Sequence, residues 1–154
     1  MSYRIDVFPE HSIALFHMWG LVTVKEAKQC FLEYVAHPDF DPTHVMLTDA
    51  RGVDEIEASY RDILLNVMGL IKPLRHFKDK ALSVILVEND MAYGMAHMLQ
   101  QVLDSVSPIR VQTVEDEVSA LALIDRPEKD FTTFLAALGY SLDMSFSDTA
   151  LAQN

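Results

Sequence analysis

The stretch VMLTDARGVD, residues 45–54, decides the fold that we predict for this chain. Its first residues are typical of a buried strand, which we expect to end at Asp49. A turn follows, and residues 55–59 lead into an amphipathic helix with Ser59 at its start. Open α/β sheets carry their functional groups just beyond the carboxyl ends of the strands, so this stretch is the first candidate for a site.

Two strands and a helix are expected before this stretch. Residues 4–7 and 13–19 are apolar segments separated by a turn, which favours an antiparallel hairpin. Thr23 precedes a helical repeat that ends near residue 37, and Glu26 follows three residues after Thr23. This spacing is that of a capping box, in which two side chains bind free backbone amides at the helix start.

Strands and helices alternate in the rest of the chain. We expect helices over 59–71 and 91–104, the second capped by residues 88–90, and strands over 81–87 and 109–113. Thr113, with Asp116 three residues later, marks a further helix start, and a last helix follows Pro127 and ends at Gly139.

This order predicts an α/β fold. Its mixed, mainly parallel sheet is opened by the antiparallel hairpin, continued by helix–strand repeats and closed by an extra C-terminal helix. We expect one domain over residues 1–139. The tail, 140–154, alternates apolar and polar residues, which is compatible with a docked segment or a short edge strand.

The hairpin, the repeats, and a strand ending on Asp49 with Val53 four residues later together resemble the STAS domain, the fold of anti-sigma-factor antagonists. The resemblance covers about residues 3–124 and extends to small uncharacterised bacterial proteins of this fold. The CRAL-TRIO lipid-transfer folds are a more distant likeness. What the resemblance implies is a non-catalytic regulatory module.

In the antagonists, an acidic residue precedes a serine or threonine at a helix start, and a partner kinase phosphorylates that hydroxyl. Glu57 stands at the acidic position, but Ala58 occupies the hydroxyl position and Ser59 comes one residue late. Ser59 is therefore a candidate phosphosite by resemblance. Its alternative role is that of a helix N-cap.

Composition limits the classes of function. The net charge of −11 disfavours nucleic acid as a partner, because phosphates would be repelled. Cys30 is the only cysteine, so we expect no disulfide and a reducing, cytoplasmic location. No apolar run reaches the ~20 residues of a membrane span, and we expect no integral membrane segment.

Two clusters of potential metal ligands occur. Carboxylates follow the central strand, and 37–44 contains two histidines and two aspartates. Both sets are also ordinary turn and cap residues. Glycine-rich phosphate loops and nucleophile elbows are absent from the sequence. We therefore expect no cofactor, no metal and no catalytic residue.

The leading prediction is a protein-interaction or regulatory module whose contact surface lies at the strand ends. We expect that surface to comprise Asp49, Arg51, Asp54, Ser59, Asn89, Asp90 and Tyr93. The alternative is a carrier of a small apolar or lipid-like ligand, because Met91, Met95 and Met98 recur at helical spacing and methionines line adaptable grooves. The same stripes are compatible with a homodimer.

Overall fold

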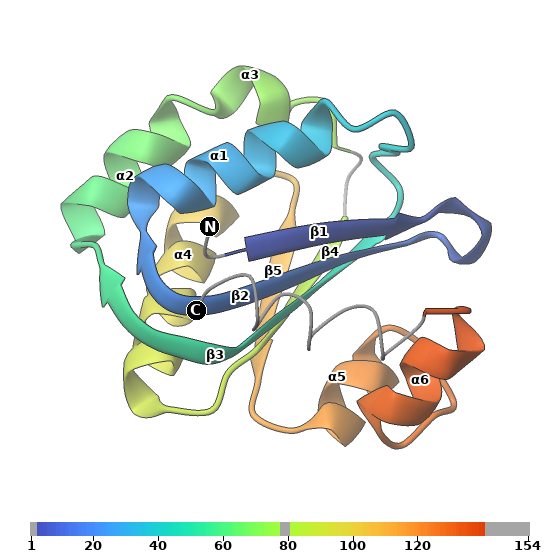
Figure 1. Ribbon diagram of the computed structural model, residues 1–154. Helices are drawn as coiled ribbons and strands as arrows, with labels where there is room; N and C mark the ends of the chain where they lie inside the picture. The colour runs from blue at the N-terminus through green and yellow to red at the C-terminus, as the bar shows by residue number, and fades with distance from the viewer. Residues whose placement is uncertain (1–2, 78–80, 141–154) are drawn as a thin grey trace.

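The computed structural model describes residues 3–77 and 81–140. Five strands form one sheet in chain order: β1 (Tyr3–Phe8), β2 (Ile13–Thr23), β3 (Val45–Glu57), β4 (Leu82–Leu86) and β5 (Arg110–Val114). β1 and β2 are antiparallel, whereas all later neighbours are parallel. The mixed, mainly parallel sheet and its opening hairpin are confirmed (Figure 1).

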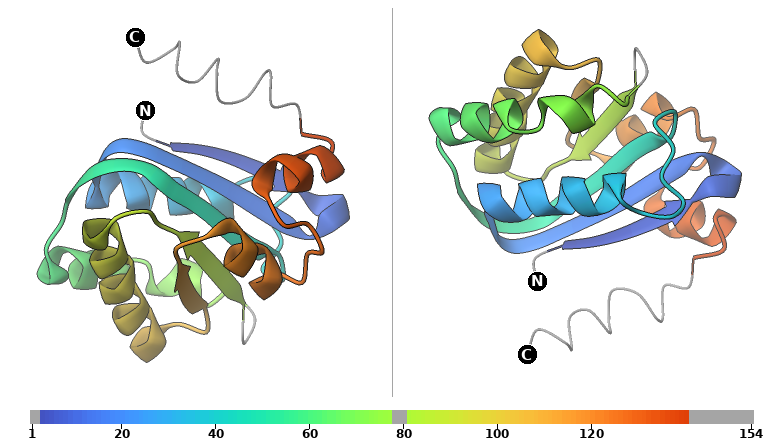
Figure 2. Two further views of the ribbon diagram at one scale, coloured as in Figure 1. Left: turned by 90° about the horizontal axis from the view of Figure 1, so that it is seen from below. Right: turned by 90° about the horizontal axis from the view of Figure 1, so that it is seen from above.

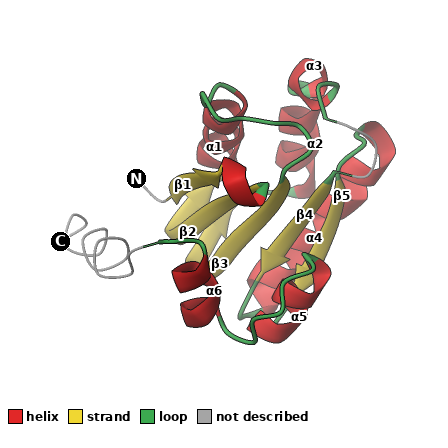
Figure 3. Ribbon diagram, turned by 90° about the vertical axis from the view of Figure 1, so that its right-hand side faces the viewer, coloured by secondary structure: helices red, strands yellow, loops and turns green. Residues whose placement is uncertain are grey.

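Helices cover both faces of the sheet, which gives three layers (Figures 1 and 2). One face carries α1 (Val24–Val35), α2 (Tyr60–Met68), α3 (Ile71–Leu74) and α4 (Asp90–Val106). The other carries α5 (Glu117–Leu123) and the expected extra helix, α6 (Phe131–Ala137). A 3-10 turn, η1 (Pro9–His11), joins the hairpin strands. Figure 3 shows the two helical layers with the sheet between them.

Side-chain caps fix most helix starts. The hydroxyl of Thr23 accepts a bond from the Glu26 amide at 3.1 Å, and Ser59 forms a reciprocal capping box with Asp62. The predicted start at Thr113 is wrong: Thr113 lies within β5, and Asp116 caps α5 by accepting from Ser119 N at 2.7 Å. Asp116 directly precedes the helix, so its carboxylate reaches the free backbone amide three residues later. Thr113 is too far from the helix start to do so.

The prediction that the central strand ends at Asp49 is also wrong. β3 continues to Glu57, so the expected turn is extended backbone. The reason is a long partner, because β2 pairs with β3 as far as Thr23 opposite Glu57. The pairing changes register near Trp19 and Gly52, where a Cβ on Gly52 would lie 3.1 Å from the Trp19 Cβ. Glycine permits this close approach.

Three smaller differences concern boundaries. α2 ends at Met68 rather than at residue 71, and Pro73 lies in the separate short helix α3. Gly139 ends the last helix as expected, with a φ of +78°. Residues 141–154, for which a docked segment or edge strand was predicted, lie outside the described residues.

Candidate ligand cavity

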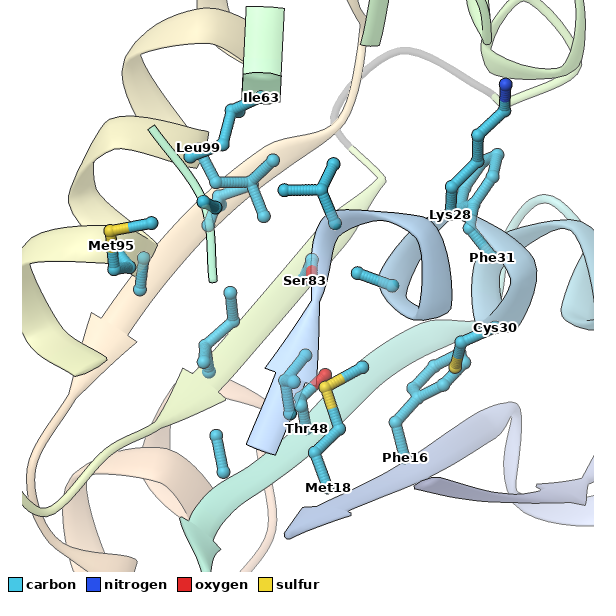
Figure 4. Close-up of a pocket in the computed structure, with 18 of the residues that line it drawn as sticks. Phe16, Met18, Lys28, Cys30, Phe31, Thr48, Ile63, Ser83, Met95 and Leu99 are labelled. Atoms are coloured by element: carbon cyan, nitrogen blue, oxygen red, sulfur yellow. The ribbon is translucent and has the colours of Figure 1, made fainter. Parts of the chain in front are cut away.

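A cavity of about 280 Å³ lies between the sheet and helices α1, α2 and α4 (Figure 4). For scale, an apolar cavity of about 150 Å³ is large enough to bind benzene. Elements from β2 to β5 and from α1 to α4 contribute to its wall. The cavity is therefore a feature of the whole α1–α4 face and not of one loop.

Short side chains on facing elements leave this space open. The strand side contributes Ala50 and Ser83, and α4 contributes Ala92 and Ala96, which pack in one cluster with Ala50. Longer residues close the ends of the cavity, among them Phe16 and Phe31, which Figure 4 shows together with Met18 and Met95. Protein interiors are normally filled to crystal-like density, so an empty volume of this size is unusual.

Five of the described side chains that line the cavity are polar: Thr23, Lys28, Thr48, Asn66 and Ser83. Thr23 is already used as the cap of α1. Thr48 and Ser83 lie on neighbouring strands with their oxygens at the cavity floor (Figure 4). Within the described part of the chain, their hydroxyls form no side-chain hydrogen bond. They are available to a polar atom of a bound molecule.

Cys30 lines the cavity and is 2% exposed. Burial, with a smaller contribution from Glu33, raises the pKa of its thiol to about 12. The thiol is therefore protonated at neutral pH. Because the thiolate is the reactive form, Cys30 acts here as a small apolar wall residue.

The residues predicted for a contact surface are divided between two parts of the molecule. Asp49 and Arg51 face α5 and α6, on the side of the sheet opposite the cavity. Arg51 lies 2.9 Å from Asp49 and 2.5 Å from Glu117, and its guanidinium packs over the Phe131 ring at 5.1 Å. These carboxylates raise the pKa of Arg51. The guanidinium is thus used within the fold.

Further residues from the prediction meet where β3 ends and α4 begins. The Asn89 amide donates to the Val53 carbonyl at 3.4 Å, while its oxygen accepts from Ala92 N at 2.8 Å. Asp54, Asp90 and Tyr93 are exposed around this point. The Tyr93 ring stacks on His97 with centroids 5.8 Å apart.

Ser59, the candidate phosphosite, is exposed and serves as the N-cap of α2. Its hydroxyl accepts from the Asp62 amide at 3.2 Å and donates to the Asp62 carboxylate at 2.9 Å. A phosphoryl group at this position would face that carboxylate, and like charges repel. The N-cap role that the sequence left open is the one that the structure displays.

The potential metal ligands of residues 37–44 serve in turns, whereas the carboxylates from Asp49 to Glu57 lie on strand β3. Asp41 accepts from Thr43 N at 2.8 Å, and His37 accepts from Asp39 N at 3.0 Å. Among residues 3–77 and 81–140, no group of three or more histidine, cysteine or acidic side chains is placed to hold a metal ion. In the same ranges, no helix combines the length and apolarity needed to cross a bilayer.

Sequence reasoning missed the cavity and its polar residues Lys28, Thr48 and Ser83. One signal was available: small residues occur at the inward positions of both β3 and α4, at Ala50, Ala92 and Ala96. The methionine pattern pointed in the same direction, since Met95 lines the cavity whereas Met91 is exposed.

No protein-family model matches this sequence, and none of the curated proteins is significantly similar to it. A similar solved structure is that of an uncharacterised protein of the DUF3478 family from Shewanella loihica PV-4, described as having a SpoIIAA-like fold. It is 19% identical, with a TM-score of 0.48 over 80% of this chain and 94% of that chain. The similarity concerns the fold alone and says nothing about function.

Proposed function

We propose that this protein binds a small apolar molecule between its sheet and helices α1, α2 and α4, as a carrier or as a ligand-dependent regulatory module. The observation that supports the proposal is the cavity of about 280 Å³ with an almost wholly apolar wall. Burial of apolar surface is the driving force, at about 25 cal/mol per Å² removed from water. Binding sites for small molecules are typically concave, mostly apolar and marked by a few polar groups, as this one is.

Native mass spectrometry of the protein purified from cells tests the proposal directly. We expect a retained mass that corresponds to an apolar molecule and that is lost on denaturation. Protein that carries no such mass, and that also fails to take up added alkyl compounds, would contradict the proposal.

A cavity-filling variant makes the test specific. Ser83→Ile places a branched apolar side chain at the cavity floor, in a strand position that suits it. We expect the retained mass to disappear and the free energy of unfolding to rise by about 0.5–2 kcal/mol, the usual gain from filling a cavity. Thr48→Val is the matched control, because it removes a floor hydroxyl without filling space and should keep the ligand.

The second candidate is the interaction module predicted from the sequence. The observation that favours it is exposed aromatic surface near the carboxyl ends of the strands, where Tyr60 is 49% and Tyr93 is 38% exposed. Tyrosine is enriched at protein interfaces. The Asp54→Ala and Tyr93→Ala variants should each weaken capture of a partner that co-purifies with the protein. Capture that is unchanged in the double variant would exclude this surface.

A further inference from the structure

Lys28 is the one charged side chain among the described residues that line the cavity. The described residues of the wall include no carboxylate, although acidic residues outnumber basic ones by 23 to 12 in the whole chain. A cation in the wall of an apolar cavity is therefore unusual for this acidic protein and suggests a role at the cavity itself. An exposed lysine on the outer surface of α1 would imply no such role, and Lys25 is one.

The geometry of Lys28 suits a group at the edge of the cavity. Figure 4 shows its aliphatic stem beside Phe31, with Nζ directed away from the sheet. Nζ lies near the C-terminal end of α2, where a Cβ on Gly69 would be 3.5 Å from it. The stem thus forms apolar wall while the ammonium stays partly in water, as long basic side chains commonly do.

No acidic side chain of the described residues forms an ion pair with Lys28. The ammonium lies near the carbonyl end of α2, where a cation is favoured. Its charge is not neutralised by a carboxylate of the described residues. Asn66 of α2 also lines the cavity, so polar groups reach it from both of these helices.

We infer that the ligand is an amphipathic monocarboxylate. Its chain lies over the sheet, and its carboxylate binds Lys28 at the edge of the cavity, where α1 meets the C-terminal end of α2. The inference rests on the proposed function, whose site it completes. By proportion to the benzene held in a cavity of about 150 Å³, the volume suits an alkyl chain of about twelve carbon atoms.

The balance of charge selects this headgroup. A single ammonium matches the single negative charge of a carboxylate, whereas phosphate sites usually gather arginines or several backbone amides. A cationic headgroup would meet Lys28 with a like charge. A carboxylate turned inward to Thr48 and Ser83 would find hydroxyls but no cation, and an unpaired charge in an apolar cavity is strongly disfavoured.

Calorimetric titration with three twelve-carbon probes below their micelle concentrations tests the inference: dodecanoate, its neutral methyl ester and dodecyltrimethylammonium. For the unaltered protein we expect dodecanoate to bind at least about tenfold more tightly than the cationic probe. Added salt should weaken the binding of dodecanoate but leave the binding of the ester unchanged, because only dodecanoate carries a charge that pairs with Lys28.

The Lys28→Met variant keeps the unbranched stem and good helix propensity but removes the charge. We expect dodecanoate to bind about ten- to hundredfold more weakly to it, the usual effect of losing a charged hydrogen-bond partner. The affinity for the ester should change less than twofold, and the Lys28→Arg variant should still bind dodecanoate. Lys25→Met, one turn earlier on the exposed side of α1, is the matched control and should leave all three affinities unchanged.

The outcomes separate the inference from the proposed function. If all three probes bind equally, or if Lys28→Met leaves dodecanoate unaffected, the carboxylate assignment is overturned while the apolar site remains. If no probe binds the unaltered protein, both the inference and the proposed function fail. Should Lys28→Met not fold, the salt dependence and the probe ranking of the unaltered protein decide the question alone.

Discussion

On the α5–α6 side of the sheet the side chains fill the available space, whereas on the α1–α4 side they do not. Leu47, Val84 and Leu86 on the strands, with Leu121 and Phe134 on the helices, are at most 1% exposed. A cavity on that side, beside Phe131 and Phe134, measures about 30 Å³, against about 280 Å³ for the cavity across the sheet. The smaller space holds little more than a water molecule.

The contrast follows from side-chain size and from polar anchoring. The filled face sets leucines and phenylalanines against strand residues and adds the Arg51–Glu117 ion pair between β3 and α5. The hollow face sets alanines against alanine and serine, and among the residues described no ion pair spans its helices. One face is therefore densely packed, and we assign binding to the other.

The largest expected effect comes from shortening a leucine on each face. Leu121→Ala on α5 should lower the free energy of unfolding by about 3–5 kcal/mol, the upper range for a fully enclosed leucine. Leu103→Ala on α4 should cost about 2 kcal/mol, because Leu103 already borders empty space and loses fewer contacts. Urea unfolding of both variants measures the difference.

The two positions form a matched pair, since both are buried helical leucines that become alanine. Their intrinsic helix propensities therefore change equally. Losses that agree within about 0.5 kcal/mol would mean that the two faces are equally well packed and that the cavity is closed in solution.

A smaller effect is expected from the polar anchor of the filled face. Glu117 binds Arg51 with one carboxylate oxygen and accepts from the Phe131 amide with the other, at 2.6 Å. Glu117→Ala removes both contacts and should cost about 1–2 kcal/mol, whereas Glu117→Gln keeps an acceptor and should cost about half as much. Thermal or urea unfolding provides the measurement.

Glu115→Ala, two residues away and exposed, is the control and should have almost no effect. Because Glu117 lies across the sheet from the cavity, its variants should leave dodecanoate affinity unchanged. A fall in that affinity in step with stability would show that the two faces are coupled and that the division between them is wrong.

Local signals in the sequence were sufficient for most of the fold. The hairpin, the alternation of helices and strands, and the caps at Thr23 and Ser59 depend on residues a few positions apart. The extension of β3 to Glu57 depends instead on the length of β2, a partner over thirty positions earlier, and on the contact between Gly52 and Trp19. Periodicity in a single segment does not contain that information.

The site was harder to predict for a related reason. A cavity is a difference between the space enclosed by several elements and the volume of their side chains, so no motif encodes it. Arg51 shows the opposite problem: it follows the expected strand end and has the right chemistry for a partner contact, but Asp49 and Glu117 engage it within the fold. Whether Asp54, Asn89, Asp90 and Tyr93 bind a partner stays a prediction.

The smallest expected effect concerns the helix caps, whose contributions to stability should respond differently to acid on the two faces of the sheet. α5 and α6 are capped by Asp116 and Asp130, whereas the neutral Thr23, Ser59 and Asn89 cap the helices on the cavity side.

Hydrogen bonds from the backbone and hydroxyl of Thr133 hold the pKa of the Asp130 carboxyl below its ordinary value of 3.8. A carboxyl whose pKa is lower in the folded state stabilises the fold at pH values above its ordinary pKa. This contribution is lost as the pH falls through the folded-state pKa. Asp130→Asn keeps a good cap but does not titrate, so it should be less stable than the unaltered protein near neutral pH and equal to it in strong acid. Urea unfolding across this pH range measures the convergence. The Thr23→Asp variant should give α1 an acid-dependent contribution to stability as well. If the free energies of unfolding of Asp130→Asn and the unaltered protein differ by the same amount at every pH, the charge of the cap contributes nothing.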